Sequence, residues 1–325
     1  MRPKIFVTQP VAESALERLR AVADVKVNPV SARVMPKPAL IAAVRKHDIL
    51  FSLLHDVVDR SVITANPKLR AVCSQSITPD NIDVKTATAR KIPVTVVPPI
   101  VAEATADIHL GLMIAVARRM IEGDRLVRAG KFPGSQSNHL AGTLVHGKTI
   151  GLIGGGGRIG RATARRAKGF GMRLIYWSPR PKPEAEKELG MERVSLDRLL
   201  RESDFVSLHP PLNDETHHMI SDREFNLMKP SAFIINTARG AIVDETALVR
   251  ALKKRKIAGA GLDVFEHEPK VPPALLNMKN VVVTPHLGSA VLDVREQMAG
   301  HVVDNVEALL AGRMPPNCAN PQVVK

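Results

Sequence analysis

The chain has 325 residues, 45% of them hydrophobic and 24% charged, a composition typical of a folded globular protein rather than a disordered chain. This length exceeds what one hydrophobic core usually serves, so we expect two domains, with the cleft between them as a natural site. The net charge of +14 would suit nucleic acid, but the one Trp, one Tyr and eight Phe do not interleave with basic residues as base stacking requires, which argues against such a partner.

The sequence shows no sign of a targeting segment or of cysteines placed for a disulfide or a metal site. The apolar run near the N-terminus is much too short for a signal peptide, and the apolar stretch at residues 108–117 falls short of the roughly twenty residues that span a bilayer. Cys73 and Cys318 lie far apart and provide neither a disulfide framework nor metal-ligand spacing. We therefore expect a cytoplasmic protein without a membrane segment or a metal site, in which both cysteines behave as small buried hydrophobic residues.

The first hundred residues alternate short β-rich runs with helical patterns. The predicted strands are residues 4–7, 25–27, 49–52, 71–74 and 93–96. Such alternation favours a parallel sheet with helices on both faces and right-handed crossovers. This part is predicted to form one α/β domain.

A second alternation follows Pro98-Pro99. Residues 103–129 read as one long helix, interrupted in composition by Gly111 and Gly123, and it leads into a second parallel sheet. The predicted strands are residues 148–153, 173–176, 205–208, 233–236, 260–262 and 281–284. A last helix over 292–310, crossing back to the first sheet, would make the first domain discontinuous.

A glycine-rich loop lies between a predicted strand and a predicted helix. Gly155, Gly157 and Gly160 fit the G-x-G-x-x-G pattern of dinucleotide-binding proteins, in the strand–turn–helix context that gives this pattern its meaning. A pyrophosphate binds there because the free N–H groups and the dipole of the helix favour negative charge. Gly154 and Gly156 could fill the first two places instead, so the register stays open.

The end of the next strand predicts which dinucleotide binds. An enzyme that uses NAD places Asp or Glu about twenty residues further on, where it binds the ribose hydroxyls. Here the strand ends at Ser178, and Arg180 and Lys182 follow. A hydroxyl and two cations suit a 2′-phosphate, so we expect NADP(H) to be preferred over NAD(H). Twelve Lys or Arg against five acids between residues 158 and 201 also suit a small polyanion.

Three further segments complete a family pattern. They are residues 236–240 (Asn-Thr-Ala-Arg-Gly), 261–269 (Gly-Leu-Asp-Val-Phe-Glu-His-Glu-Pro) and 284–289 (Thr-Pro-His-Leu-Gly-Ser). Together with the glycine loop they resemble the D-isomer-specific 2-hydroxyacid dehydrogenases. The resemblance covers nearly the whole chain, because residues 79–83 (Pro-Asp-Asn-Ile-Asp) and 103–107 (Glu-Ala-Thr-Ala-Asp) are also similar to that family.

The resemblance implies two doubly wound parallel-sheet α/β domains. A flavodoxin-like substrate domain would comprise residues 1–99 and 290–325, and a Rossmann cofactor domain residues 100–289. The long helix after Pro99 would form much of a homodimer interface.

The family's catalytic residues map onto Arg239, Glu268 and His286. Reduction of a 2-oxo acid requires a cation to hold the carboxylate, a hydride source and a proton donor for the developing alkoxide. Arg239 follows a strand end and its planar fork grips a carboxylate, while His286 supplies the proton. Glu268 would fix the tautomer of His286 and favour its charged form. Glu266 is a poorer match for that role.

Other binding residues are carried over from the family with less individual support. The substrate-binding residues would be Leu54, Ser76 and Ile77 beside Arg239 and His286. In the substrate loop this chain has Ser76-Ile77-Thr78 where the family usually has Gly-Val-Gly, so the two hydroxyls add bulk and hydrogen-bonding capacity. The expected cofactor-binding residues are Thr105, Gly155, Gly157, Arg158, Ile159, Ser178, Arg180, Lys182, Pro211, Thr216, Thr237, Ala238, Arg239, Asp263, His286 and Gly288.

Within the family, the pattern is most similar to glyoxylate/hydroxypyruvate reductases that use NADPH. A reductase of a longer sugar acid such as 2-ketogluconate is the first alternative, and a corepressor-like module that senses nucleotides is a weaker one. Glu268 argues against a formate dehydrogenase, which has Gln there, and Ile77 argues against a phosphite dehydrogenase, which needs Lys. His209, before Pro210-Pro211, is expected only to end a buried strand.

Overall fold

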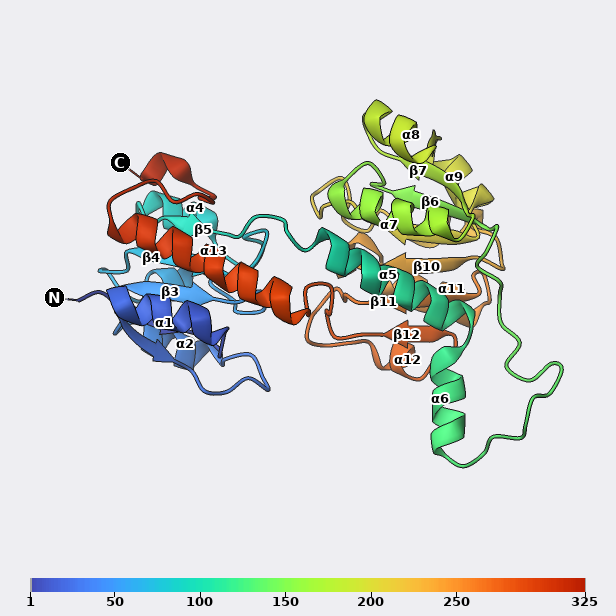
Figure 1. Cartoon of the computed structure of the whole chain (residues 1–325), viewed down its shortest axis with the longest axis horizontal. Coiled ribbons are helices and arrows are strands. Elements are labelled where there is room, and N and C mark those ends of the chain that lie inside the picture. The colour runs from blue at the N-terminus through green and yellow to red at the C-terminus, as the bar shows by residue number, and fades with distance from the viewer. Residues whose placement is uncertain (1, 325) are drawn as a thin grey trace. The chain divides into compact units, whose positions relative to one another are not determined.

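A computed structural model describes residues 2–324 of the chain. It divides into two compact units, of which the first comprises Met1–Ile100 with Val291–Lys325 and the second comprises Val101–Ala290. Each unit is built on its own parallel sheet (Figure 1). The predicted α/β fold class with two doubly wound sheets is therefore confirmed.

The first unit has a five-stranded sheet in the order β2-β1-β3-β4-β5. The interior strands β3 and β4 are buried along their whole length, as expected for a parallel sheet covered on both faces. Its strands are β1 (Lys4–Val7), β2 (Asp24–Val27), β3 (Ile49–Ser52), β4 (Ala71–Ser74) and β5 (Val94–Thr95). Its helices are α1 (Glu13–Val22), α2 (Lys37–Val44), α3 (Arg60–Ile63), α4 (Val84–Ala89), α13 (Leu292–Leu310) and the 3-10 helix η2 (Pro321–Val323).

The C-terminal helix α13 belongs to this first unit. It packs on α1 and β4, and Figure 1 shows it beside α1. Arg18 of α1 joins the two helices by bonding Asp304 and Glu307, each at 2.8 Å. Cys73 is fully buried in β4, where burial raises the pKa of its thiol to about 12, while Cys318 is half-buried near the C-terminus.

The second unit has a seven-stranded sheet in the order β12-β11-β10-β9-β6-β7-β8. Successive side chains of a strand point to opposite faces: Ile234 of β10 joins one hydrophobic cluster, and its neighbours Phe233 and Ile235 join another. The strands are β6 (Thr149–Ile153), β7 (Arg173–Trp177), β8 (Glu192–Arg193), β9 (Phe205–Leu208), β10 (Phe233–Asn236), β11 (Gly259–Leu262) and β12 (Val281–Val283). The helices are α5 (Ala102–Ala117), α6 (Met120–Arg128), α7 (Arg158–Gly169), α8 (Pro183–Leu189), α9 (Leu196–Glu202), α10 (Asp222–Leu227), α11 (Glu245–Lys253), α12 (Pro273–Leu276) and the 3-10 helix η1 (Gly240–Ile242).

The order of this sheet reverses at β6. From β6 the chain first builds β7 and β8 on one side, then returns to build β9 to β12 on the other side. A crevice forms at such a reversal because the connections leave the carboxyl ends of the two neighbouring strands in opposite directions. The ends of β6 and β9 are therefore the place where this unit should bind a ligand.

The prediction of one helix over 103–129 was wrong. Two helices, α5 and α6, meet at Arg119, whose φ of 52° is left-handed and interrupts the helix. The N–H of Thr143 donates to the carbonyl of Ala117 at 2.8 Å, so the end of α5 is bonded to a distant segment instead of to a continuing helix. Gly111 and Gly123, which suggested interruptions, lie inside the two helices.

None of the helices within residues 2–324 combines the length and the apolar character needed to cross a bilayer.

Candidate active site

The glycine loop joins β6 to α7 at the reversal of the sheet. Gly154 makes the turn with φ of 78°, and a Cβ atom there would lie 2.8 Å from the backbone N of Pro210. Gly157 is the N-cap of α7, and Gly160 packs in its first turn against Gly155. Residues 154–157 of the loop thus contribute only backbone at the N-terminus of this twelve-residue helix, which fits the pyrophosphate of a dinucleotide.

The segment after β7 lies against the glycine loop. Ser178 is buried, and its hydroxyl donates to the carbonyl of Arg180 at 2.6 Å, which fixes the turn. The side chain of Lys182 passes so close to Gly156 that a Cβ atom on that glycine would lie 2.1 Å from its Cγ. Arg193 of β8 holds the same turn by donating to the carbonyls of Ser178 and Pro179. Lys182 and Arg193 therefore lie beside the end of β7, and Arg180 is exposed in the turn that follows it.

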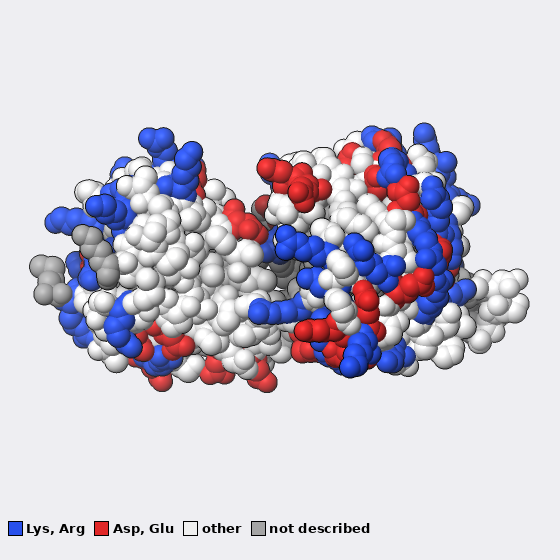
Figure 2. Space-filling view, turned by 90° about the horizontal axis from the view of Figure 1, so that it is seen from above, with Lys and Arg blue, Asp and Glu red and all other residues white. Residues whose placement is uncertain are grey.

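Most other basic residues of this region have acidic partners. Figure 2 shows Lys and Arg interspersed with Asp and Glu over the second unit. These ion pairs join Arg161 to Glu188, Arg165 and Arg166 to Glu103, Arg173 to Glu192 and Glu202, and Arg198 to the same two glutamates. Within residues 2–324, Arg158, Arg180 and Lys182 form no ion pair. Lys168, Lys187 and Arg193 also form no ion pair within these residues, and of the six cations without an acidic partner Arg158 and Lys182 lie at the glycine loop.

Arg239 stands on a tight turn after β10. The side chain of Asn236 builds this turn, because its amide donates to the carbonyl of Arg239 at 3.0 Å while its oxygen accepts from the N–H of Ala238 at 3.0 Å. The Arg239 guanidinium donates to the carbonyl of Ala238 at 2.8 Å and is half-buried. Gly240 lies against Phe265, where a Cβ atom would be 1.9 Å from the carbonyl carbon. Glycine therefore lets the turn pack on the segment that leads to Glu268.

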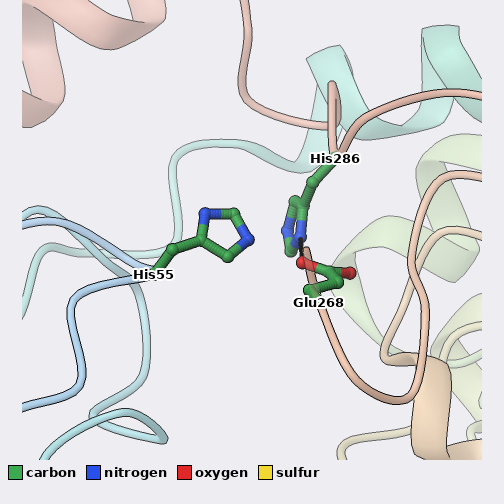
Figure 3. Close-up of side chains that lie close together, drawn as sticks. All are labelled: His55, Glu268 and His286. Carbon is green, nitrogen blue, oxygen red and sulfur yellow. Dashed lines mark hydrogen bonds and ion pairs between the residues drawn. The ribbon is translucent and has the colours of Figure 1, made fainter. Parts of the chain in front are cut away.

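Glu268 and His286 form a hydrogen-bonded pair (Figure 3). Nδ1 of His286 lies 2.8 Å from Oε2 of Glu268, and Oε1 of the same carboxylate accepts from the N–H of Phe265 at 2.9 Å. An ionised carboxylate only accepts, so Nδ1 must carry the proton of this bond. Glu266, the poorer match in the sequence, instead contacts His218 at 2.9 Å.

Asp263 holds the loop that carries His286. Its carboxylate accepts from the N–H groups of Leu287 at 2.7 Å and Gly288 at 2.9 Å, and from the hydroxyl of Thr284 at 2.6 Å. Burial raises the pKa of this carboxyl, although these bonds act in the opposite direction. His286 itself has a left-handed φ of 57°, a conformation that must be held by its surroundings.

The other predicted cofactor residues lie on the same carboxyl edge of the second sheet. Thr105, on α5, donates to the carbonyl of Gly288 at 3.0 Å. Thr216 donates to the carbonyl of Pro211 at 2.6 Å in the loop after β9. Thr237 and Ala238 are buried between β10 and Arg239, and Ile159 lies in the first turn of α7.

The predicted substrate residues of the first unit lie at the ends of its strands. Leu54 follows β3, and Ser76 and Ile77 follow β4. Ser76 is buried and donates to the carbonyl of Thr78 at 2.7 Å, and Thr78 donates to Asp80 at 2.8 Å. The two hydroxyls that distinguish this loop therefore have partners inside it. His55, also drawn in Figure 3, belongs to the loop after β3 and was not singled out from the sequence.

A buried polar network lies under this edge and was not predicted from the sequence. His109 of α5 lies between Thr237 and Ser207, and Ser207 also contacts His209. The sequence predicts only a strand end at His209, and this contact was missed. A pattern of polar residues separated by two positions could have drawn attention to Ser207 and His209, but nothing local connects them to His109.

Comparisons with known proteins agree with this geometry. Residues 110–288 match the family model "D-isomer specific 2-hydroxyacid dehydrogenase, NAD binding domain". A glyoxylate reductase of Thermococcus litoralis is 45% identical over 330 residues, covering 100% of this chain and 98% of that protein. A glyoxylate reductase of Pyrococcus furiosus is 44% identical over 329 residues, covering 100% of this chain and 97% of that protein.

Solved structures are similar over the same length. An NADPH-dependent glyoxylate/hydroxypyruvate reductase from Sinorhizobium meliloti, in complex with NADP and malonate, has a TM-score of 0.83 at 31% identity and covers 100% of this chain and 99% of its own. A glyoxylate reductase from Paecilomyes thermophila has a TM-score of 0.82 at 33% identity, covering 98% and 99%.

A dinucleotide cradle beside a histidine–carboxylate pair and an arginine defines the protein as an oxidoreductase with an NAD-binding domain. The chain belongs to the D-isomer-specific 2-hydroxyacid dehydrogenases.

Proposed function

We propose that this protein reduces a small 2-oxo acid, glyoxylate or hydroxypyruvate, to the D-2-hydroxy acid with NADPH. The observation that carries the proposal is the Glu268–His286 pair beside the turn of Arg239 and the cofactor cradle of the same unit. The relatives at 44–47% identity over the whole chain are glyoxylate reductases, which supports the choice of substrate.

Arg239, His286 and Glu268 each have a separate role in the proposed reaction. Arg239 binds the carboxylate of the substrate with its planar fork. His286, oriented by Glu268, donates a proton from Nε2 to the carbonyl oxygen as that oxygen gains charge, and Glu268 stabilises the imidazolium from which the proton leaves. The bound nicotinamide supplies the hydride that adds to the carbonyl carbon. One hydride and one proton thus convert the 2-oxo acid into the hydroxy acid.

The preference for NADPH rests on the segment after β7. Residues 178–182 contain no carboxylate that would bind ribose hydroxyls and repel a 2′-phosphate. Arg180 and Lys182 are exposed cations without an ion pair within residues 2–324, and Lys182 lies over the glycine loop. Both suit charge-assisted hydrogen bonds to a phosphate.

The division of labour between the units follows from the same proposal. The second unit would bind the cofactor, and the first unit would bring Leu54, Ser76 and Ile77 to the substrate. Backbone N–H groups of the 76–78 loop remain suitable for a carboxylate, as in any such loop. We also propose that the protein acts in the cytoplasm, where NADPH is available.

We also propose a homodimer formed through α5, α6 and the segment that follows them. Figure 1 shows α6 and residues 130–147 extending from the body of the second unit, and α6 contains no buried residue. Phe132 is 65% exposed and Leu144 is 60% exposed, together with Met120, Ile121 and Val127. A second copy would cover this apolar surface.

Sedimentation experiments test the proposed homodimer. Phe132→Asp should yield monomers, while Leu276→Asp, at an exposed position of α12, should leave the dimer intact. A monomeric wild type would contradict the proposal.

A substrate panel tests the proposed activity. Initial rates with glyoxylate, hydroxypyruvate, pyruvate and 2-ketogluconate, each with NADPH and NADH at equal ionic strength, should give the highest kcat/KM for glyoxylate or hydroxypyruvate with NADPH. The highest value for 2-ketogluconate, or no turnover of any of them, would contradict the proposed function.

A further inference from the structure

Four side chains form a continuous hydrogen-bonded chain inside the second unit. Oγ1 of Thr237 lies 2.9 Å from Nδ1 of His109, Nε2 of His109 lies 2.6 Å from Oγ of Ser207, and that Oγ lies 2.7 Å from Nε2 of His209. His109 and Ser207 are fully buried, and the two imidazole rings lie 4.7 Å apart between centroids. A buried polar chain of this length is costly unless its bonds are made.

Both histidines are neutral at neutral pH. Burial, with a smaller contribution from His209, lowers the pKa of His109, and burial lowers the pKa of His209 to about 3. A neutral imidazole has one N–H donor and one bare nitrogen that accepts. Ser207 has a single proton to place between two Nε2 atoms, so it donates to one imidazole and accepts from the other. The whole chain must therefore point in one of two directions.

The two directions differ at the ends of the chain. If the bonds run from Thr237 toward His209, the hydroxyl of Thr237 donates to Nδ1 of His109, and Nδ1 of His209 carries a proton. If they run the opposite way, His109 donates from Nδ1 to Thr237, and Nδ1 of His209 is bare. That Nδ1 is buried and has no hydrogen-bond partner within residues 2–324. A buried N–H without a partner is rarer than a lone pair without one, so the second direction is favoured.

The ends of this chain lie in the proposed cofactor site. Thr237 begins the turn of Arg239 at the carboxyl end of β10. His209 follows β9, its N–H donates to the carbonyl of Ile153 at 2.9 Å, and its backbone lies against Gly154 of the glycine loop. His109 and Ser207 thus connect the carboxyl ends of β9 and β10, and the end of β9 lies beside the glycine loop at the reversal of the sheet.

We propose that His109 and Ser207 are positioning residues that orient the hydroxyl of Thr237, so that its proton is directed away from His109 and toward the bound nicotinamide cofactor. This inference rests on the proposed function, because it requires a cofactor at the carboxyl edge of β10. The bond donated by His109 fixes the lone pair of Thr237 that receives it, and the hydroxyl then acts as a donor of defined direction.

The direction of the chain is tested by NMR of protein labelled with 15N at its histidines. His109 is expected to carry its proton on Nδ1 and His209 on Nε2, and neither ring should titrate between pH 5 and 8. Assignment comes from comparison with His109→Asn and His209→Asn. A proton on Nε2 of His109, or a charged ring at pH 7, would overturn the inference without reference to activity.

Cofactor affinity separates positioning from mere stability. The amide of Asn approximates Nδ1 of histidine, so His109→Asn keeps a donor for Thr237, whereas His109→Leu removes it. Fluorescence titration with NADPH should show affinity weakened about tenfold in His109→Leu and within about threefold of wild type in His109→Asn. Ser207→Ala should weaken binding more than Ser203→Ala, which removes an equally buried hydroxyl bonded to Leu199 on the same unit.

Each outcome has one meaning. Equal NADPH affinity in wild type and His109→Leu, or equal losses in Ser207→Ala and Ser203→Ala, would overturn the positioning role while leaving the proposed function intact. A wild type that binds neither NADPH nor NADH would overturn the proposed function, and the positioning role with it.

Discussion

Nδ1 of His286 donates to Oε2 of Glu268 at 2.8 Å, and both side chains are less than one fifth exposed. The proton on Nδ1 is held in this bond to Glu268. The proton that His286 transfers to the substrate must therefore be on Nε2. Glu268→Gln keeps the size of the side chain but removes the negative charge, which disfavours the imidazolium. We expect kcat to fall by about ten- to a hundredfold, since removal of the carboxylate that orients a functional histidine typically lowers activity by that factor.

Glu266→Gln is the matched control for this prediction, since Glu266 contacts His218 instead of His286. Its kcat should stay within about threefold of that of the wild type. Equal losses of kcat in Glu268→Gln and Glu266→Gln would argue against the assignment of Glu268.

Arg239 is predicted to bind the carboxylate in the ground state and in the transition state alike. Arg239→Lys retains the positive charge but loses the planar fork, and Arg239→Ala loses both. We therefore expect KM for the 2-oxo acid to rise in both variants, more steeply in Arg239→Ala, with kcat also reduced. Steady-state kinetics with glyoxylate measure this. If KM in Arg239→Ala equals that of the wild type, the carboxylate is held elsewhere.

Cofactor preference should respond to the segment after β7. Two charge-assisted hydrogen bonds to a 2′-phosphate correspond to a preference of about a hundredfold for NADPH, and this preference should weaken with salt because Arg180 and Lys182 are exposed. Ser178→Asp should shift kcat/KM toward NADH, and Arg180→Ala should reduce the use of NADPH. The control is Arg165→Ala, because Arg165 pairs with Glu103 away from this segment. Equal use of both cofactors by the wild type would refute this interpretation.

The free energy of unfolding should fall at acid pH because of the two buried histidines, His109 and His209. An unfolded histidine has a pKa of about 6.5, whereas burial lowers the pKa of His209 to about 3 and that of His109 in the same direction. Below about pH 6.5 the unfolded state therefore binds protons that the native state excludes. Stability is fully present above that pH and is lost, by about 1.4 kcal/mol per pH unit for each histidine, as the pH falls toward the native pKa.

Urea unfolding between pH 5 and 8 measures this loss. His109→Asn removes one of the two groups, so its free energy of unfolding should fall less steeply with acidification than that of the wild type. Parallel curves would show that His109 is not held neutral in the native state.

The fold could largely be predicted because its signals are local. Strands such as Ile49–Ser52 and Phe205–Leu208 are short apolar runs buried on both faces, and the helix Leu292–Leu310 has the predicted bounds. The break at Arg119 could not be predicted, because it depends on Thr143 bonding the end of α5 from a distant segment. The two-residue strand β8 was too short to leave a pattern.

The site shows the same limit. Gly155, Arg239, Glu268 and His286 stand in motifs, so their residue types and spacing are enough to single them out. His109 and Ser207 are 98 residues apart and meet only because α5 packs on the sheet. A single sequence contains no sign of that contact, so the sequence predicts only a strand end at His209.

The central claim is that His286 is the proton donor of a reductase that uses NADPH, and one variant tests it most directly. His286→Ala should lose about a hundred- to ten-thousandfold in kcat for glyoxylate reduction, the usual worth of general acid catalysis. The NADPH dissociation constant, measured by fluorescence on the same preparation, should stay within about threefold of wild type, since one neutral contact at most is lost. A variant that binds NADPH normally and keeps more than a tenth of the wild-type kcat would contradict the account.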